Sequence, residues 1–120
     1  MKKLLSIFIL IIASSNLKAN VIDCSEPISN TVFQVEMKKI KVHDFEEAKK
    51  EAIEKFFKGN CFTSAQIKIL LDNLIFEEHK LELAKKAYAH VTDKDNFVII
   101  KSIFEFDDAK EELSKYIKNN

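Results

Sequence analysis

A histidine and a glutamate at helical spacing are the side chains of this 120-residue chain that come nearest to a metal site. His79 and Glu82 are three residues apart, so on a helix they would share one face and form half of a site. Carboxylate-bridged metal bundles use Glu-x-x-His on two helices, and here Phe76 stands where that motif needs glutamate. A single partial pair predicts solvated polar side chains, so we expect no metal site.

Paired carboxylates are the other candidate for chemistry, and they recur at positions 46–47, 77–78, 107–108 and 111–112. No Asp-x-Asp-x-Asp-Gly loop supports calcium binding, and a single glycine excludes a glycine-rich phosphate loop. His43 and His90 fall in a predicted connector and near the end of a predicted helix, and no Ser-His-Asp or Cys-His order is legible. We therefore expect no catalytic residue, no cofactor-binding residue and no cofactor.

Three of these acidic pairs belong to a repeated phrase, Phe-acid-acid-x-Lys, which starts at Phe45, Phe76 and Phe106. The starts are 31 and 30 residues apart, a period typical of stacked supersecondary units that cannot bury their apolar faces alone. We expect each Phe to be a structural staple that folds back onto the first turn of the following helix. The two acids are expected at the positive end of that helix's dipole.

Apolar spacing and capping residues predict six short helices around these phrases. Ser29 or Asn30 is expected to cap the first helix. Asp44, with Glu47 three residues later, is expected to form a capping box for the second helix. Gly59 is expected to end that helix, because glycine tolerates the left-handed conformation.

The third helix has the clearest signal, because Thr63 and Gln66 form a capping box before an apolar stripe. A fourth helix follows the second phrase, a fifth follows the capping signal at Thr92, and Asp107 can cap the sixth. Residues 98–100 are β-branched and resemble a strand, but the capping signal before them favours a helix. The predicted fold class is all-α: six short helices as three stacked helix pairs with a repeat of about 30 residues.

The first 19 residues have the three-part pattern of a secretory signal peptide. A basic start at residues 1–3 precedes an apolar run from Leu4 to Ala13, which is too short to span a bilayer comfortably. Cleavage is expected after Ala19, with Ser15 the other candidate and an uncleaved membrane anchor the alternative. We expect an exported protein, periplasmic or extracellular, with no stable membrane span after cleavage.

The mature chain is then expected to contain an extended lead-in (20–28) and a helical domain (29–120). Removal of the signal peptide takes away three lysines and leaves sixteen lysines against nineteen acids, with no arginine. Nucleic-acid binding needs a basic face and draws heavily on arginine, so we exclude nucleic acid as a partner.

Two cysteines remain in the mature chain, Cys24 and Cys61. An even number in an exported protein favours a disulfide over free thiols. A lipid anchor at Cys24 is the rival interpretation, but a lipidation site needs a small residue before the cysteine, and Asp23 stands there. The absence of a Cys-x-x-Cys motif argues against catalytic redox chemistry.

Several motifs from Asn60 onward resemble a known family. They read Asn-Cys-Phe-Thr-Ser-Ala-Gln-Ile-Lys from Asn60, Phe-Glu-x-x-Lys-Leu-Glu-Leu-Ala-Lys-x-Ala-Tyr over residues 76–88, Val-Thr-Asp from Val91, and Glu-Leu-x-x-Tyr-Ile from Glu112. In this order they resemble the bacterial domain of unknown function numbered 4476, found largely in exported proteins. The resemblance covers about half of the chain well, and residues 24–58 more loosely. It implies an all-helical domain with a Cys24–Cys61 bridge and supplies no activity or ligand.

We expect a non-enzymatic domain with a protein-binding or structural role in the cell envelope, because no constellation of convergent polar residues is visible. The adjacent Phe56 and Phe57 are the expected exposed patch for an unknown protein partner. One alternative is an envelope metal-binding protein or enzyme that uses His79 and Glu82. Another is a small carrier whose phenylalanines line a pocket for an apolar ligand.

Overall fold

The computed structural model describes residues 23–120, so the predicted signal peptide lies outside the described residues. Six helices account for most of this part: α1 (Asn30–Lys41), α2 (Glu46–Phe57), α3 (Ser64–Leu71), α4 (Glu77–Ala87), the 3-10 helix η2 (Lys94–Ile103) and α5 (Asp107–Asn119). A short 3-10 turn, η1 (Tyr88–His90), extends α4. Residues 98–100 are helical, and within 23–120 the only β-pairing is one isolated bridge. The all-α prediction is confirmed.

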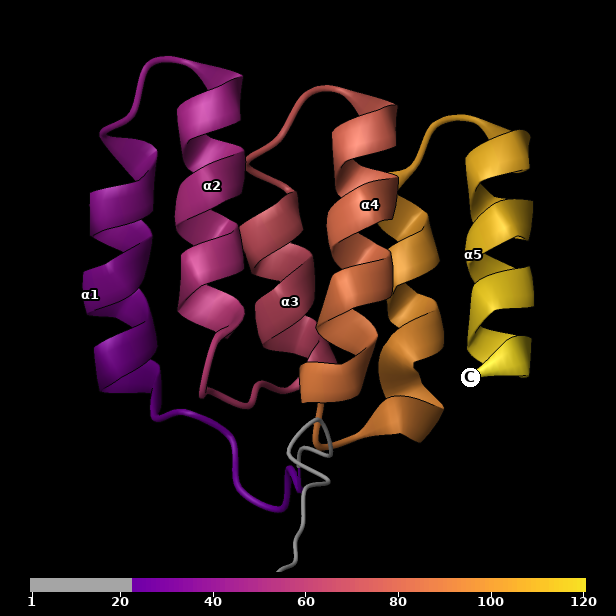
Figure 1. Cartoon of the computed structure of the whole chain (residues 1–120), viewed down its shortest axis with the longest axis horizontal. Helices are drawn as coiled ribbons and strands as arrows, with labels where there is room; N and C mark the ends of the chain where they lie inside the picture. Colours follow the sequence, from indigo (N-terminus) through magenta and orange to yellow (C-terminus); the bar gives the residue numbers. More distant parts are fainter. Residues whose placement is uncertain (1–22) are drawn as a thin grey trace, which may run out of the picture.

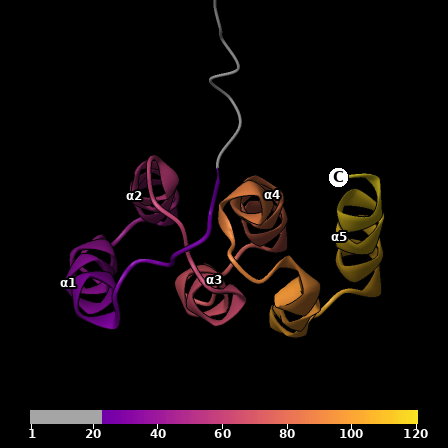
Figure 2. The same cartoon turned by 90° about the horizontal axis from the view of Figure 1, so that it is seen from below.

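The helices run back and forth between two layers. Figure 2 shows α1, α3 and η2 in one layer, while α2, α4 and α5 form the other. Successive helices are antiparallel, so the loops inside the three pairs lie along one edge, at the top of Figure 1. We call this the corner edge and define it as residues 42–47, 75–78 and 104–108. The predicted architecture of three stacked pairs is confirmed, and every helix of one layer starts at the same edge.

Two of the predicted helix caps are confirmed. The Ser29 hydroxyl accepts a hydrogen bond from the Val32 N–H at 3.3 Å. At the start of α3, the Thr63 hydroxyl accepts the Gln66 N–H at 3.1 Å, and the Gln66 amide oxygen accepts the Thr63 N–H at 2.9 Å. These reciprocal bonds satisfy two donors that a helix start otherwise leaves without partners.

The predicted N-caps of α2, η2 and α5 are wrong, whereas Gly59 has the left-handed conformation predicted for the end of α2, with φ 73°. The N-cap of α2 is Phe45, with no side-chain cap bond, so the expected capping box at Asp44 does not form. Phe106, rather than Asp107, is the N-cap of α5. Asp93, one residue beyond Thr92, is the N-cap of η2. In α2, α4 and α5 the first turn instead holds the two acids of each phrase, as predicted, where their charges complement the helix dipole.

A single cluster of apolar side chains fills the space between the layers. The predicted stripes of α3 and η2 belong to it, including Ile67, Leu70 and Ile100. The prediction that Phe56 and Phe57 form an exposed patch is wrong, because both are buried and pack against the Phe62 ring at 4.9 and 5.8 Å between centroids. Neighbouring helices contact α2 from both sides, so its buried face is wide enough to take two adjacent residues.

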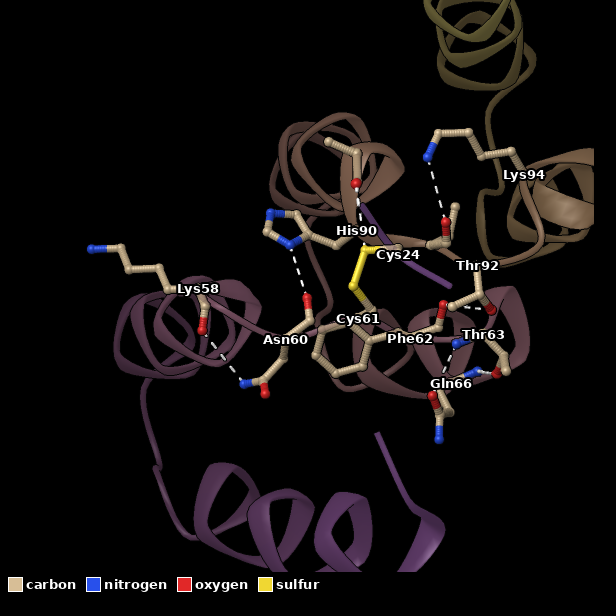
Figure 3. The surroundings of a disulfide bond; sticks show 12 residues. Cys24, Lys58, Asn60, Cys61, Phe62, Thr63, Gln66, His90, Thr92 and Lys94 are labelled. Carbon is tan, nitrogen blue, oxygen red and sulfur yellow. Dashed lines mark hydrogen bonds between the residues drawn. A yellow bond between two sulfur atoms is a disulfide. The ribbon is translucent and has the colours of Figure 1, made fainter. Parts of the chain in front are cut away.

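The edge opposite the corners is held together by a disulfide and short backbone pairings (Figure 3). Cys24 and Cys61 are bonded, with their Cα atoms 5.5 Å apart, as the sequence predicted. The Ile28 N–H donates to the Cys61 carbonyl at 2.8 Å, which fixes the lead-in against the α2–α3 loop. The Phe62 carbonyl accepts the Thr92 N–H, and the Phe62 N–H donates to the His90 carbonyl, each at 2.8 Å. These bonds join the α2–α3 loop to the segment between α4 and η2.

Candidate interaction surface

The three repeated phenylalanines lie on the corner edge and are exposed to solvent. Phe45, Phe76 and Phe106 expose 78%, 54% and 61% of their surface, and the neighbouring Ile75 exposes 79%. A staple residue precedes the cap, whereas these residues are the N-caps themselves. The three phenylalanines therefore do not occupy the position predicted for a staple, and their rings form an apolar row on the surface outside the core cluster.

A glutamate from the preceding unit holds each of the second and third corners in place. The Glu46 carboxylate accepts the Ile75 N–H at 2.7 Å and the Phe76 N–H at 2.8 Å. In the same way, the Glu77 carboxylate accepts the Glu105 N–H at 3.0 Å and the Phe106 N–H at 3.1 Å. We call this arrangement the corner clamp. It makes the first acid of one phrase the anchor of the next phrase.

The clamp satisfies backbone donors at a helix start with a charged acceptor, which gives stronger hydrogen bonds than a neutral one. Burial of the Glu46 side chain opposes its ionisation, but the hydrogen bonds from Ile75, Phe76 and His79 outweigh this effect. Together they hold the pKa of the Glu46 carboxyl below its ordinary value of 4.5. The backbone of the second and third corners is therefore anchored by hydrogen bonds even though the side chains of Phe76 and Phe106 are exposed.

His79 and Glu82, the pair considered as half of a metal site, bind different partners. The Nδ1 atom of His79 is 2.9 Å from Glu46, and its Nε2 atom is 3.7 Å from Glu47. Glu82 instead pairs with Lys50 at 3.0 Å and with Lys86 at 3.3 Å. Within residues 23–120, no group of three or more His, Cys, Asp or Glu side chains could hold a metal ion.

The remaining histidines and cysteines have structural surroundings. His90 places Nδ1 3.0 Å from the Asn60 carbonyl and stacks on Phe57, as Figure 3 shows for the first contact. His43 lines a groove between α1 and α2. Cys24 is occupied by its bond to Cys61. Among the described residues, no helix is both long enough and apolar enough to cross a bilayer.

The corner edge is acidic as well as apolar. Its three segments carry eight carboxylates and no lysine. Between the second and third corners lies an open groove of about 480 Å³, lined by Ile75, Phe76, Phe106, three glutamates (Glu77, Glu78 and Glu105) and one lysine, Lys80. Such a surface can receive apolar side chains that have basic groups beside them, because the rings supply apolar contact and the carboxylates supply charge.

Sequence reasoning missed the function of Glu46 and Glu77 in the clamps. Their recurrence after each Phe was the available signal, and it was explained by the helix dipole alone. Nothing local to either phrase shows that its glutamate reaches a backbone about 30 residues further along the chain.

A family model described as "Domain of unknown function (DUF4476)" matches residues 27–117, a range that contains all three corners and both clamps. No curated protein and no solved structure matches the chain.

Proposed function

The chain belongs to the DUF4476 family, and we propose that it is a non-enzymatic exported domain that binds another protein through the corner edge. One observation carries this proposal: apolar residues from three separate corners lie exposed along a single edge. A folded protein gains no stability by exposing such residues, and a row of them is typical of an interaction site.

The clamps support this function because they fix the shape of the surface before a partner arrives. Each clamp anchors the backbone at the exposed residue itself, at Phe76 and at Phe106. A surface that is already ordered loses less conformational entropy on binding, so more of the contact energy appears as affinity.

The charge of the corner edge specifies the chemistry of the partner. With eight carboxylates and no lysine in its three segments, the edge complements a surface that presents Lys or Arg beside apolar side chains. Complementary charge of this kind steers the partner toward the surface and weakens as salt is added.

The signal-peptide pattern and the disulfide support a location outside the cytoplasm. The first 19 residues have the composition of a secretory signal, and a structural disulfide persists in oxidising compartments. We therefore place the partner in the cell envelope or outside the cell.

The test compares two triple variants as baits in an envelope extract of the source organism. The first variant removes the apolar row by the substitutions Phe45→Ser, Phe76→Ser and Phe106→Ser. The second variant is the control and removes three exposed apolar residues of the other helix layer by Val35→Ser, Ile69→Ser and Val98→Ser. We expect at least one protein captured by the wild type and by the second variant to be depleted about tenfold or more with the first. Its capture should also decrease with added salt. A captured set that does not distinguish the two variants would contradict the proposal.

A further inference from the structure

The first unit carries an open groove at the end of the array, and this groove reaches the corner edge at His43. It lies between α1 and α2 and has a volume of about 560 Å³. Its α1 side is lined by Val32 and Glu36, and its α2 side by Ala48, Glu51, Ala52 and Lys55. We call it the end groove.

The matching positions of α3, in the second unit, are covered. Counted from the N-caps Ser29 and Thr63, Val32 corresponds to Gln66 and Glu36 corresponds to Leu70. Both Gln66 and Leu70 are buried, and the Gln66 amide donates to the Ile28 carbonyl of the lead-in at 3.1 Å and to the Asn30 side chain of α1 at 3.2 Å. In the second unit, therefore, the preceding unit fills the space that is open in the first.

The matching positions of α4 and α5 are covered as well. Counted from the phenylalanine that caps each helix, Ala52 corresponds to Leu83 of α4 and to Leu113 of α5. Both leucines are fully buried, whereas Ala52 is only partly buried. The end groove is therefore the one copy of this surface, among the described residues, that has no preceding helix pair against it.

Charged pairs fix the register of the internal interface between α2 and α4. Lys50 binds Glu82 at 3.0 Å, and Lys86 binds Glu54 at 2.8 Å. We call α2 the docking helix and α4 the receiving helix. The docking helix carries a lysine followed four residues later by a glutamate, and the receiving helix carries a glutamate followed four residues later by a lysine.

The end groove carries charges in the same order as the receiving helix α4, a glutamate followed four residues later by a lysine. Glu51 and Lys55 of α2 occupy the positions of Glu82 and Lys86 of α4, and both are exposed. From this correspondence we propose that the end groove binds an amphipathic helix of a partner protein, which carries Lys and Glu four residues apart on the face that docks. This helix packs on the first unit as α2 packs on α4. The end groove includes none of the three corner phenylalanines in its lining, so it is a second binding surface beside their apolar row.

A second copy of the chain does not have the right charges to fill the groove. On α5, the positions of Lys50 and Glu54 are occupied by Glu111 and Lys115, which pair with each other at 3.8 Å. A copy docked head to tail in the internal register would oppose Glu111 to Glu51 and Lys115 to Lys55. Like charges at both contacts disfavour that assembly, which argues for a partner protein as the occupant.

The test turns α5 into a helix with the docking charges, so that a second copy becomes the probe. Glu111→Lys with Lys115→Glu gives α5 the order of Lys50 and Glu54. In sedimentation velocity at low salt, we expect the wild-type protein to stay monomeric and this double variant to self-associate at least about tenfold more tightly. Adding Ala52→Arg, which fills the groove, should return the variant to the monomer.

Two further variants test the charge register. Glu51→Lys with Lys55→Glu should by itself promote self-association, since the reversed groove then complements the natural α5. Combining both reversals restores like charges and should restore the monomer. The proposal is overturned if neither reversal promotes association, if the combined variant associates as strongly as the single reversals, or if the wild type itself associates through the groove.

Discussion

The carboxylate of Glu46 accepts the backbone N–H of Phe76 at 2.8 Å, across a separation of 30 residues and between two successive helix pairs. The same carboxylate accepts the Ile75 N–H and contacts His79. A single side chain therefore joins the start of α2 to the start of α4, and Glu77 repeats the arrangement one unit later. Stability and surface presentation are linked at this contact, because it fixes the backbone of an exposed corner.

Replacement of the clamp should destabilise the fold. Glu46→Ala leaves two backbone donors without their charged acceptor, so we expect the free energy of unfolding to decrease by about 1–3 kcal/mol in urea titrations. Glu47→Ala is the matched control, because the Glu47 carboxylate lies next to Glu46 in the chain but is largely exposed. This substitution should change the free energy of unfolding by less than about 0.5 kcal/mol. Equal effects of the two variants would show that the clamp contributes nothing specific.

Acid should weaken the clamp. The pKa of Glu46 is lower in the folded state than its ordinary value of 4.5, so the unfolded state binds more protons as the pH falls. Its stabilising contribution is complete above that value and is lost as the pH falls through 4.5 and then through the lower folded pKa. Unfolding free energies measured from neutral to acidic pH should decrease less steeply for Glu46→Gln than for the wild type. The exposed-site control Glu78→Gln should keep the wild-type slope.

The disulfide should contribute to stability without determining the fold. In the loop-entropy model, a bridge between Cys24 and Cys61 stabilises by about 3–4 kcal/mol. We expect Cys24→Ser with Cys61→Ser to lose that amount in denaturant titrations while keeping its helical circular dichroism, because the apolar cluster remains. Intact mass of the wild type should rise by two hydrogens on reduction, and free thiols in the oxidised protein would refute the bridge.

The corner phenylalanines should be dispensable for stability. Phe45→Ala removes a ring that is mostly in solvent, so the unfolding free energy should change by less than about 0.5 kcal/mol. Phe97→Ala, at a fully buried position of η2, should cost about 3–5 kcal/mol. A large loss for Phe45→Ala would restore the interpretation of this residue as a structural staple.

The sequence alone determined the local features of this protein. Residue types within a few positions of one another predicted the six helices and their repeat in three units. They also predicted the Thr63–Gln66 capping box and the apolar stripes of α3 and η2. Such signals are legible because helix periodicity and capping depend on neighbours in the chain. The family resemblance added the Cys24–Cys61 pairing, which the structure contains.

Only the tertiary structure decided which side chains meet across units and which remain outside. The exposure of the corner phenylalanines, the burial of Phe56 and Phe57, and the hydrogen bonds from Glu46 to the next corner all depend on how the units stack. The order of charges at the end groove can likewise be interpreted only by comparison with the Lys50–Glu82 contact between α2 and α4. Contacts over about thirty residues leave no local pattern, because each partner satisfies its own helix signals equally well without the other.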